Sequence, residues 1–218
     1  LVDNCCSGGG RLDYAMLARS DIAWISDDHR DPQSMIRTLN GTTLALPPEI
    51  CTRTFGTILR NRDDMAWALR VPLFGQYCVS GLEDGWRDPA STEYALIRRH
   101  LAVYKEFLRP FMRTCQVFHH TPVLVGADRS PWCVIEYAAA DGDRAAIGVF
   151  RLDDEADRSC RIHPRGLTAD RIYRVTLDND QRSWTAGGRE LMQKGLAVDL
   201  PERTDSELIL LAEDETER

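Results

Sequence analysis

The chain has 218 residues, 43% of them hydrophobic and 28% charged, which is ordinary for a globular protein with a sizeable core. Its net charge of −7 argues against a nucleic-acid partner, because such a partner usually needs a clustered basic surface. No apolar run approaches the roughly 18 residues of a membrane span, so no membrane partner is expected.

The start of the chain and its cysteines bear on location. The first residue is Leu1, and no basic segment followed by an apolar one opens the chain, so we expect a fragment without a signal peptide. The seven cysteines are an odd number and show neither a CxxC pair nor a zinc-site spacing. We therefore expect reduced thiols, a cytoplasmic location, no metal and no cofactor.

Short apolar runs alternate with helix-compatible segments over residues 1–90. Buried strands are predicted at Ile22–Ile25, Thr43–Leu46 and Trp67–Phe74. Helices are predicted within Asp31–Asn40 and Thr57–Asp64. Alternation of this kind is typical of a parallel α/β sheet or barrel.

A longer helix is predicted from Tyr94 to Phe111. Its apolar residues recur at spacings of three and four, which places one apolar stripe against a core. Ser91 or Thr92 can cap its start, and Pro89 keeps it from beginning earlier.

From Thr114 onward the pattern changes to strand-length apolar runs separated by turn signals. The runs are Val117–Phe118, Trp132–Ala138, Ala145–Leu152, Ile172–Leu177, Leu196–Leu200 and Leu208–Ala212. The turn signals are Asp141-Gly142, Asp178-Asn179 and Gly187-Gly188. This pattern predicts an antiparallel β-domain, with a sandwich as the natural two-layer solution, and a disordered tail at Glu213–Arg218.

Two stretches are candidates for chemistry. Asp3–Asp13 contains three consecutive glycines, Gly8 to Gly10, which allow the backbone to approach a ligand closely. No Lys-Ser/Thr follows them, so a phosphate loop is disfavoured, while a flexible loop and a ligand-binding loop both stay open. Trp24–Asp31 is an apolar strand that ends in carboxylates, which fits either the catalytic face of a barrel or an acidic helix cap.

These stretches carry a resemblance to a known family. The run DNCCSGGGRLDYAMLARSDIAWISDDHRD resembles the signature of glycoside hydrolase family 36, the bacterial-type α-galactosidases, with its N-C-x-S-G-G-G-R and W-x-S-D patterns. Downstream, Gly41–Pro47 resembles the family's G-T-S-x-x-Y-P, and Gly188–Leu196 resembles its G-x-E-L-M-x-x-G-L. The resemblance covers nearly the whole chain.

The resemblance implies an architecture and an activity. Residues 1–112 would form the C-terminal half of a (β/α)8 TIM barrel, strands five to eight, and residues 113–218 an antiparallel β-sandwich domain. The implied activity is retaining hydrolysis of terminal α-galactosyl residues from raffinose- or melibiose-type oligosaccharides. An α-N-acetylgalactosaminidase, a raffinose-type galactosyltransferase and a non-catalytic carbohydrate-binding protein stay open, as does homo-oligomerisation of the complete protein.

The resemblance also implies roles for single residues. The general acid/base would be Asp27, and Cys5 and Gly8 would contact the sugar. A retaining enzyme needs a second carboxylate as nucleophile, about 5–5.5 Å from the first. In the family it lies in an upstream K-W-D segment that this chain lacks, and Asp88, which follows the last expected strand, is a poor substitute. We therefore expect this polypeptide alone to be inactive.

Overall fold

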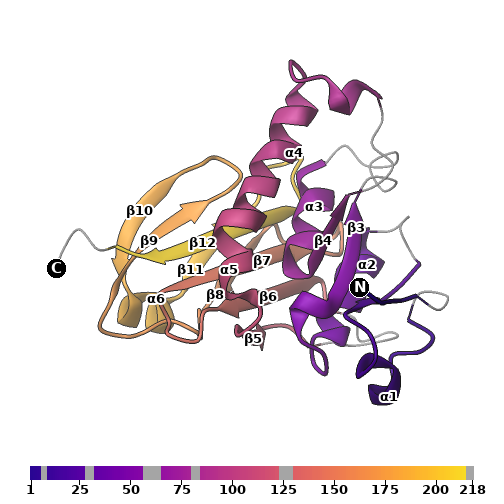
Figure 1. Ribbon diagram of the computed structural model, residues 1–218. Coiled ribbons are helices and arrows are strands. Elements are labelled where there is room, and N and C mark those ends of the chain that lie inside the picture. Colours follow the sequence, from indigo (N-terminus) through magenta and orange to yellow (C-terminus); the bar gives the residue numbers. More distant parts are fainter. Residues whose placement is uncertain (6–8, 28–31, 56–64, 80–83, 123–129, 215–218) are drawn as a thin grey trace. The chain divides into compact units, whose positions relative to one another are not determined.

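The computed structural model describes residues 1–5, 9–27, 32–55, 65–79, 84–122 and 130–214 (Figure 1). The chain divides into two compact units, Leu1–Arg113 and Thr114–Arg218.

The first unit contains a four-stranded parallel sheet whose strand order is the chain order. Its strands are β1 (Asp3–Asn4), β2 (Ile22–Trp24), β3 (Cys51–Phe55) and β4 (Gln76–Val79). The connections carry α1 (Tyr14–Leu17), α2 (Pro32–Thr42), α3 (Met65–Arg70) and the 3-10 helices η1 (Pro48–Ile50) and η3 (Val71–Phe74), and a further 3-10 helix, η4 (Asp84–Arg87), follows β4. Because all four strands run in one direction, their carboxyl ends lie at the same edge of the sheet.

Helix α2 supplies three residues to the core of this unit, Met35, Ile36 and Leu39, each with no exposed surface. This helix contacts η3, which in turn contacts β3 and β4. The helix prediction at Asp31–Asn40 is therefore confirmed over its described part. The prediction at Thr57–Asp64 falls entirely on residues outside the described ones.

Two strand predictions in this unit are wrong. Trp67–Phe74 forms α3 and η3 instead of a strand, and Thr43–Leu46 forms the turn that follows α2. Trp67–Phe74 is buried throughout, Arg70 included, and a short mostly apolar run that is buried on every side fits a strand and a helix equally. The strands themselves are β3 and β4, at Cys51–Phe55 and Gln76–Val79.

The long helix is confirmed, with a change of geometry inside it. It comprises α4 (Thr92–Ala102), the π-helical segment η5 (Val103–Leu108) and α5 (Arg109–Met112). Ser91 is the N-cap, since its Oγ accepts a hydrogen bond from the backbone N–H of Tyr94 at 3.0 Å. Pro110 cannot donate a backbone hydrogen bond, which accounts for the irregular turns just before it.

The second unit is built on a six-stranded antiparallel sheet, ordered β10-β9-β12-β7-β6-β5, with a separate two-stranded sheet, β11-β8 (Figure 1). The larger sheet comprises β5 (Gln116–His119), β6 (Trp132–Ala138), β7 (Arg144–Arg151), β9 (Ile172–Leu177), β10 (Ser183–Gly187) and β12 (Ser206–Glu213). The other elements are β8 (Ser159–Ile162), α6 (Gly188–Lys194) and β11 (Leu196–Asp199). All six predicted runs coincide with strands, so the antiparallel β-domain is confirmed.

One apolar cluster joins the two sheets and α6. It includes Ile147 and Tyr173 from the larger sheet, Ile162 and Val198 from the smaller one, and Leu191 from α6. The second layer is thus a two-stranded sheet with a helix. Both Trp132 and Trp184 pack against this cluster.

The turn predictions hold in part. Asp141-Gly142 makes the β6–β7 turn, where Gly142 adopts φ +72°, and Asp178-Asn179 lies between β9 and β10. Gly187 and Gly188 instead end β10 and begin α6.

The prediction of a disordered tail is wrong at its start. Glu213 ends β12 and forms an ion pair with Arg171 at 3.1 Å, while Asp214 pairs with Arg174 at 2.9 Å. Residues 215–218 lie outside the described part of the chain.

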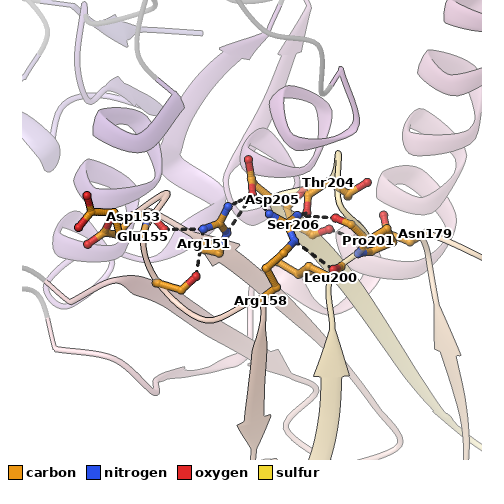
Figure 2. A network of polar contacts seen from close by, with 11 residues as sticks. Arg151, Asp153, Glu155, Arg158, Asn179, Leu200, Pro201, Thr204, Asp205 and Ser206 are labelled. Carbon is orange, nitrogen blue, oxygen red and sulfur yellow. Dashed lines mark hydrogen bonds and ion pairs between the residues drawn. The ribbon is translucent and has the colours of Figure 1, made fainter.

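Two arginines connect the loops around residues 153–158 and 200–205 (Figure 2). Arg151, which is 6% exposed, donates from Nε and Nη2 to Oδ1 of Asp205 at 3.0 and 2.9 Å, and from Nη1 to the carbonyl oxygen of Asp153 at 2.8 Å. Arg158 donates to the same Oδ1 at 3.4 Å and to the carbonyl oxygen of Thr204 at 2.7 Å. A single carboxylate oxygen therefore accepts from both guanidinium groups.

Candidate active site

The carboxyl edge of the parallel sheet carries two of the three predicted site residues. Strands β1 and β2 pair in parallel, with Asn4 opposite Ala23, and both of these residues are buried. Cys5 directly follows β1, and Asp27 lies three residues beyond the end of β2. The strand register therefore places both exposed residues at the same edge. Gly8, the third, lies outside the described residues.

Two contacts fix the described residues at the ends of the glycine-rich loop. The side-chain amide of Asn4 donates to the carbonyl oxygen of Arg11 at 2.7 Å, which joins the two ends of the loop. Gly9 adopts φ +92°, and a β-carbon built on it would lie 2.7 Å from the carbonyl oxygen of Ile25. Only glycine satisfies both the angle and the space. The loop after β1 thus lies against the segment that leads from β2 to Asp27.

Asp27 is exposed, but one of its oxygens is held. The indole Nε1 of Trp24 donates a hydrogen bond to Oδ1 of Asp27 at 2.9 Å. Trp24 is half-buried at the end of β2, and Ile25, the next residue, is 3% exposed. The arrangement presents an anchored carboxylate to solvent at the edge where parallel α/β folds bind their ligands.

Other carboxylates in this unit hold the backbone. Oδ1 of Asp13 accepts from the backbone N–H groups of Ala15 and Met16, both at 3.0 Å, so Asp13 is the N-cap of α1. Oδ1 of Asp88 accepts from the N–H of Ala90 at 2.9 Å, in the turn before α4. These contacts give Asp13 and Asp88 structural roles.

Sequence reasoning missed the partner of Asp27. Trp24 belongs to the W-x-S-D pattern, but its hydrogen bond depends on the path of the chain as it leaves β2. The spacing of three residues at the end of a strand was the only available signal.

Neither a metal centre nor a membrane-spanning helix is found within the described ranges. In those ranges, no group of three or more His, Cys, Asp or Glu side chains could hold a metal ion. His120, from the His119-His120 pair, bonds instead to Oε2 of Glu136 at 2.7 Å. No helix in the part of the chain that the structure describes is both long and apolar enough to cross a membrane.

Comparisons with known proteins agree on one family. Residues 132–211 match the model of the glycosyl hydrolase family 36 C-terminal domain. The chain is 25% identical over 206 residues to a probable alpha-galactosidase C of Aspergillus terreus, an alignment that covers 90% of this chain and 25% of that protein. The chain therefore spans about a quarter of the length of this curated relative.

Two solved structures share the fold. The galactosidase domain of the alpha-galactosidase-sucrose kinase AgaSK superposes with a TM-score of 0.80 at 20% identity, over 98% of this chain and 29% of that one. The family 36 alpha-galactosidase AgaA of Geobacillus stearothermophilus, solved with 1-deoxygalactonojirimycin, gives a TM-score of 0.76 at 20% identity, over 97% and 28%. The family model over residues 132–211, the curated relative and these two structures thus all point to glycoside hydrolase family 36, of whose members this chain resembles the C-terminal part.

Proposed function

We propose that this chain is part of a retaining α-galactosidase that removes terminal α-galactosyl residues from raffinose- or melibiose-type oligosaccharides. The supporting observation is the position of Asp27, an exposed carboxylate held by Trp24 at the carboxyl edge of a parallel sheet. The similarity to a probable alpha-galactosidase C of Aspergillus terreus supports the choice of sugar.

In this proposal β1 to β4 are strands five to eight of a (β/α)8 barrel. Two observations support it: the strands are parallel and ordered as in the chain, and helices lie between them. In such barrels the active site is built at the carboxyl ends of the strands. The remaining strands would come from sequence upstream of Leu1.

Asp27 then acts as the general acid/base. In the first step it protonates the oxygen of the leaving group while a carboxylate nucleophile attacks the anomeric carbon. In the second step it removes a proton from the water that releases galactose. Cys5 and Gly8 contact the sugar, and the nucleophile comes from outside this chain, so the 218-residue polypeptide alone is inactive.

The test uses the natural polypeptide that contains this chain, assayed with 4-nitrophenyl α-galactoside and with melibiose. Asp27→Ala should abolish hydrolysis of melibiose, whose leaving group needs protonation. Sodium azide should restore turnover of the nitrophenyl substrate and yield α-galactosyl azide, because azide attacks the covalent intermediate without base assistance.

Asp21→Asn is the matched control. Asp21 lies at the amino end of β2, where Oδ2 accepts from the N–H of Val2 at 2.7 Å, and an asparagine oxygen can keep that bond. This variant should retain activity on both substrates. Unchanged hydrolysis of melibiose by Asp27→Ala would contradict the acid/base role, and efficient hydrolysis by the 218-residue polypeptide would contradict the missing nucleophile.

A further inference from the structure

The bond between Trp24 and Asp27 makes the two oxygens of the carboxyl group inequivalent. The indole Nε1–H of Trp24 lies 2.9 Å from Oδ1 of Asp27. An indole nitrogen donates but cannot accept a hydrogen bond. Oδ1 is therefore the acceptor, and a neutral Asp27 is favoured with its proton on Oδ2, because a carbonyl oxygen accepts a hydrogen bond better than a carboxylic hydroxyl does.

We propose that Trp24 is a positioning residue that confines the exchangeable proton of Asp27 to Oδ2. This inference rests on the proposed function and specifies the acid/base oxygen. In the first step the Oδ2–H bond breaks and its proton goes to the leaving-group oxygen as that oxygen separates from the anomeric carbon. In the second step the proton lost by the attacking water returns to Oδ2.

The sheet explains how a single donor can select the oxygen. Trp24 is the last residue of β2 and is paired with Thr52 of β3, so its backbone is fixed by a neighbouring strand. Asp27 is exposed and lies beyond the strand, and the terminal torsion of an aspartate is broad and roughly two-fold. The hydrogen bond from the indole N–H favours one of these two orientations.

The packing of the intervening residues supports the same geometry. Ile25 is 3% exposed, and its carbonyl group lies against the backbone of Gly9. The path from Trp24 to Asp27 is thus fixed both by a buried side chain and by the glycine-rich loop. The donor and the acceptor are held at the two ends of a constrained segment of four residues.

The test replaces only the N–H group. In the natural polypeptide, Trp24 is exchanged for 3-benzothienylalanine, in which sulfur takes the place of the indole N–H and the ring keeps its shape. Values of kcat/KM are measured for melibiose, a poor leaving group, and for 2,4-dinitrophenyl α-galactoside, which leaves without protonation. Because losing one hydrogen bond costs about 1 kcal/mol, kcat/KM for melibiose should fall about five- to tenfold. The kcat/KM for the dinitrophenyl substrate should change by no more than about twofold, since its transition state does not use the proton.

The same exchange at Trp184, which packs against the core of the second unit, is the control. It should leave kcat/KM unchanged for both substrates. Equal losses on both substrates at Trp24, or no loss on either, would overturn the positioning role. The proposed function is judged separately by Asp27→Ala: if that variant loses melibiose hydrolysis while the Trp24 exchange has no selective effect, only this inference fails.

Discussion

The backbone of Gly9 lies directly against the carbonyl group of Ile25, so that a β-carbon on Gly9 would approach that oxygen to 2.7 Å. This contact joins the loop after β1 to the segment that carries Asp27. It gives the glycine-rich stretch a physical function at the site, in addition to any contact with a ligand.

Gly9→Ala should therefore damage both stability and activity. The substitution places a side chain at φ +92° and forces the backbone away from Ile25, at a cost of about 1–3 kcal/mol. The variant of the natural polypeptide should have a lower melting temperature and a lower rate of melibiose hydrolysis. Gly85→Ala is the control, because a β-carbon there meets no heavy atom within 4 Å among the described residues. Equal melting temperatures for the two variants would contradict the packing argument.

Glu136 is expected to be a major stabilising group of the second unit. Its carboxylate is fully buried and accepts from Nε2 of His120 at 2.7 Å, from the N–H of Gly166 at 2.8 Å and from the N–H of Arg165 at 3.0 Å. Glu136→Gln would turn an amide group toward these donors, and the loss should be about 3 kcal/mol, measured by urea unfolding of the chain.

Glu190→Gln provides the comparison for that variant. Glu190 pairs with Lys194 at 2.9 Å, but both side chains are exposed, so the pair is screened and contributes little. Similar unfolding midpoints for the Glu136 and Glu190 variants would show that the buried carboxylate is not needed to hold the loop at Arg165 and Gly166.

The arginine network of Figure 2 predicts that Arg151 cannot be replaced by lysine. Its planar guanidinium group serves Asp205 and the carbonyl oxygen of Asp153 at once, and an ammonium group cannot reproduce that geometry. Because Arg151 is 6% exposed, Arg151→Lys should lower the unfolding free energy by about 2 kcal/mol. In Arg182→Lys an exposed pair with Asp180 at 3.9 Å is altered, and no comparable loss is expected.

The second unit was more predictable from sequence than the first. Runs such as Trp132–Ala138 and Ile172–Leu177 coincide with β6 and β9 because strand-length apolar segments were bounded by turn residues. Strand β8, Ser159–Ile162, was missed because its residues are mostly exposed or half-buried and carry no apolar run. In the first unit, Trp67–Phe74 was misassigned because burial on all sides removes the periodicity on which such predictions depend.

The candidate site was predictable as a motif but not as a geometry. The family-like pattern pointed to Cys5 and Asp27, and the register of β1 and β2 places both at one edge. The bond from Trp24 to Asp27 and the contact of Gly9 with Ile25 depend on how the chain leaves β2, and no pattern of residue types encodes that path.

Cys160 should be alkylated more slowly than the exposed Cys5. Burial, together with the negative charge of Asp199, raises the pKa of the Cys160 thiol to about 11. Because only the thiolate reacts, modification by iodoacetamide at pH 8 should be slow and should accelerate about tenfold per pH unit until the pH nears that value. Asp199→Asn removes the charge, lowers the pKa and should speed the reaction of Cys160 while leaving Cys5 unchanged. Peptide mass spectrometry resolves the two sites, and a Cys160 rate that does not change between pH 8 and pH 10 would contradict the raised pKa.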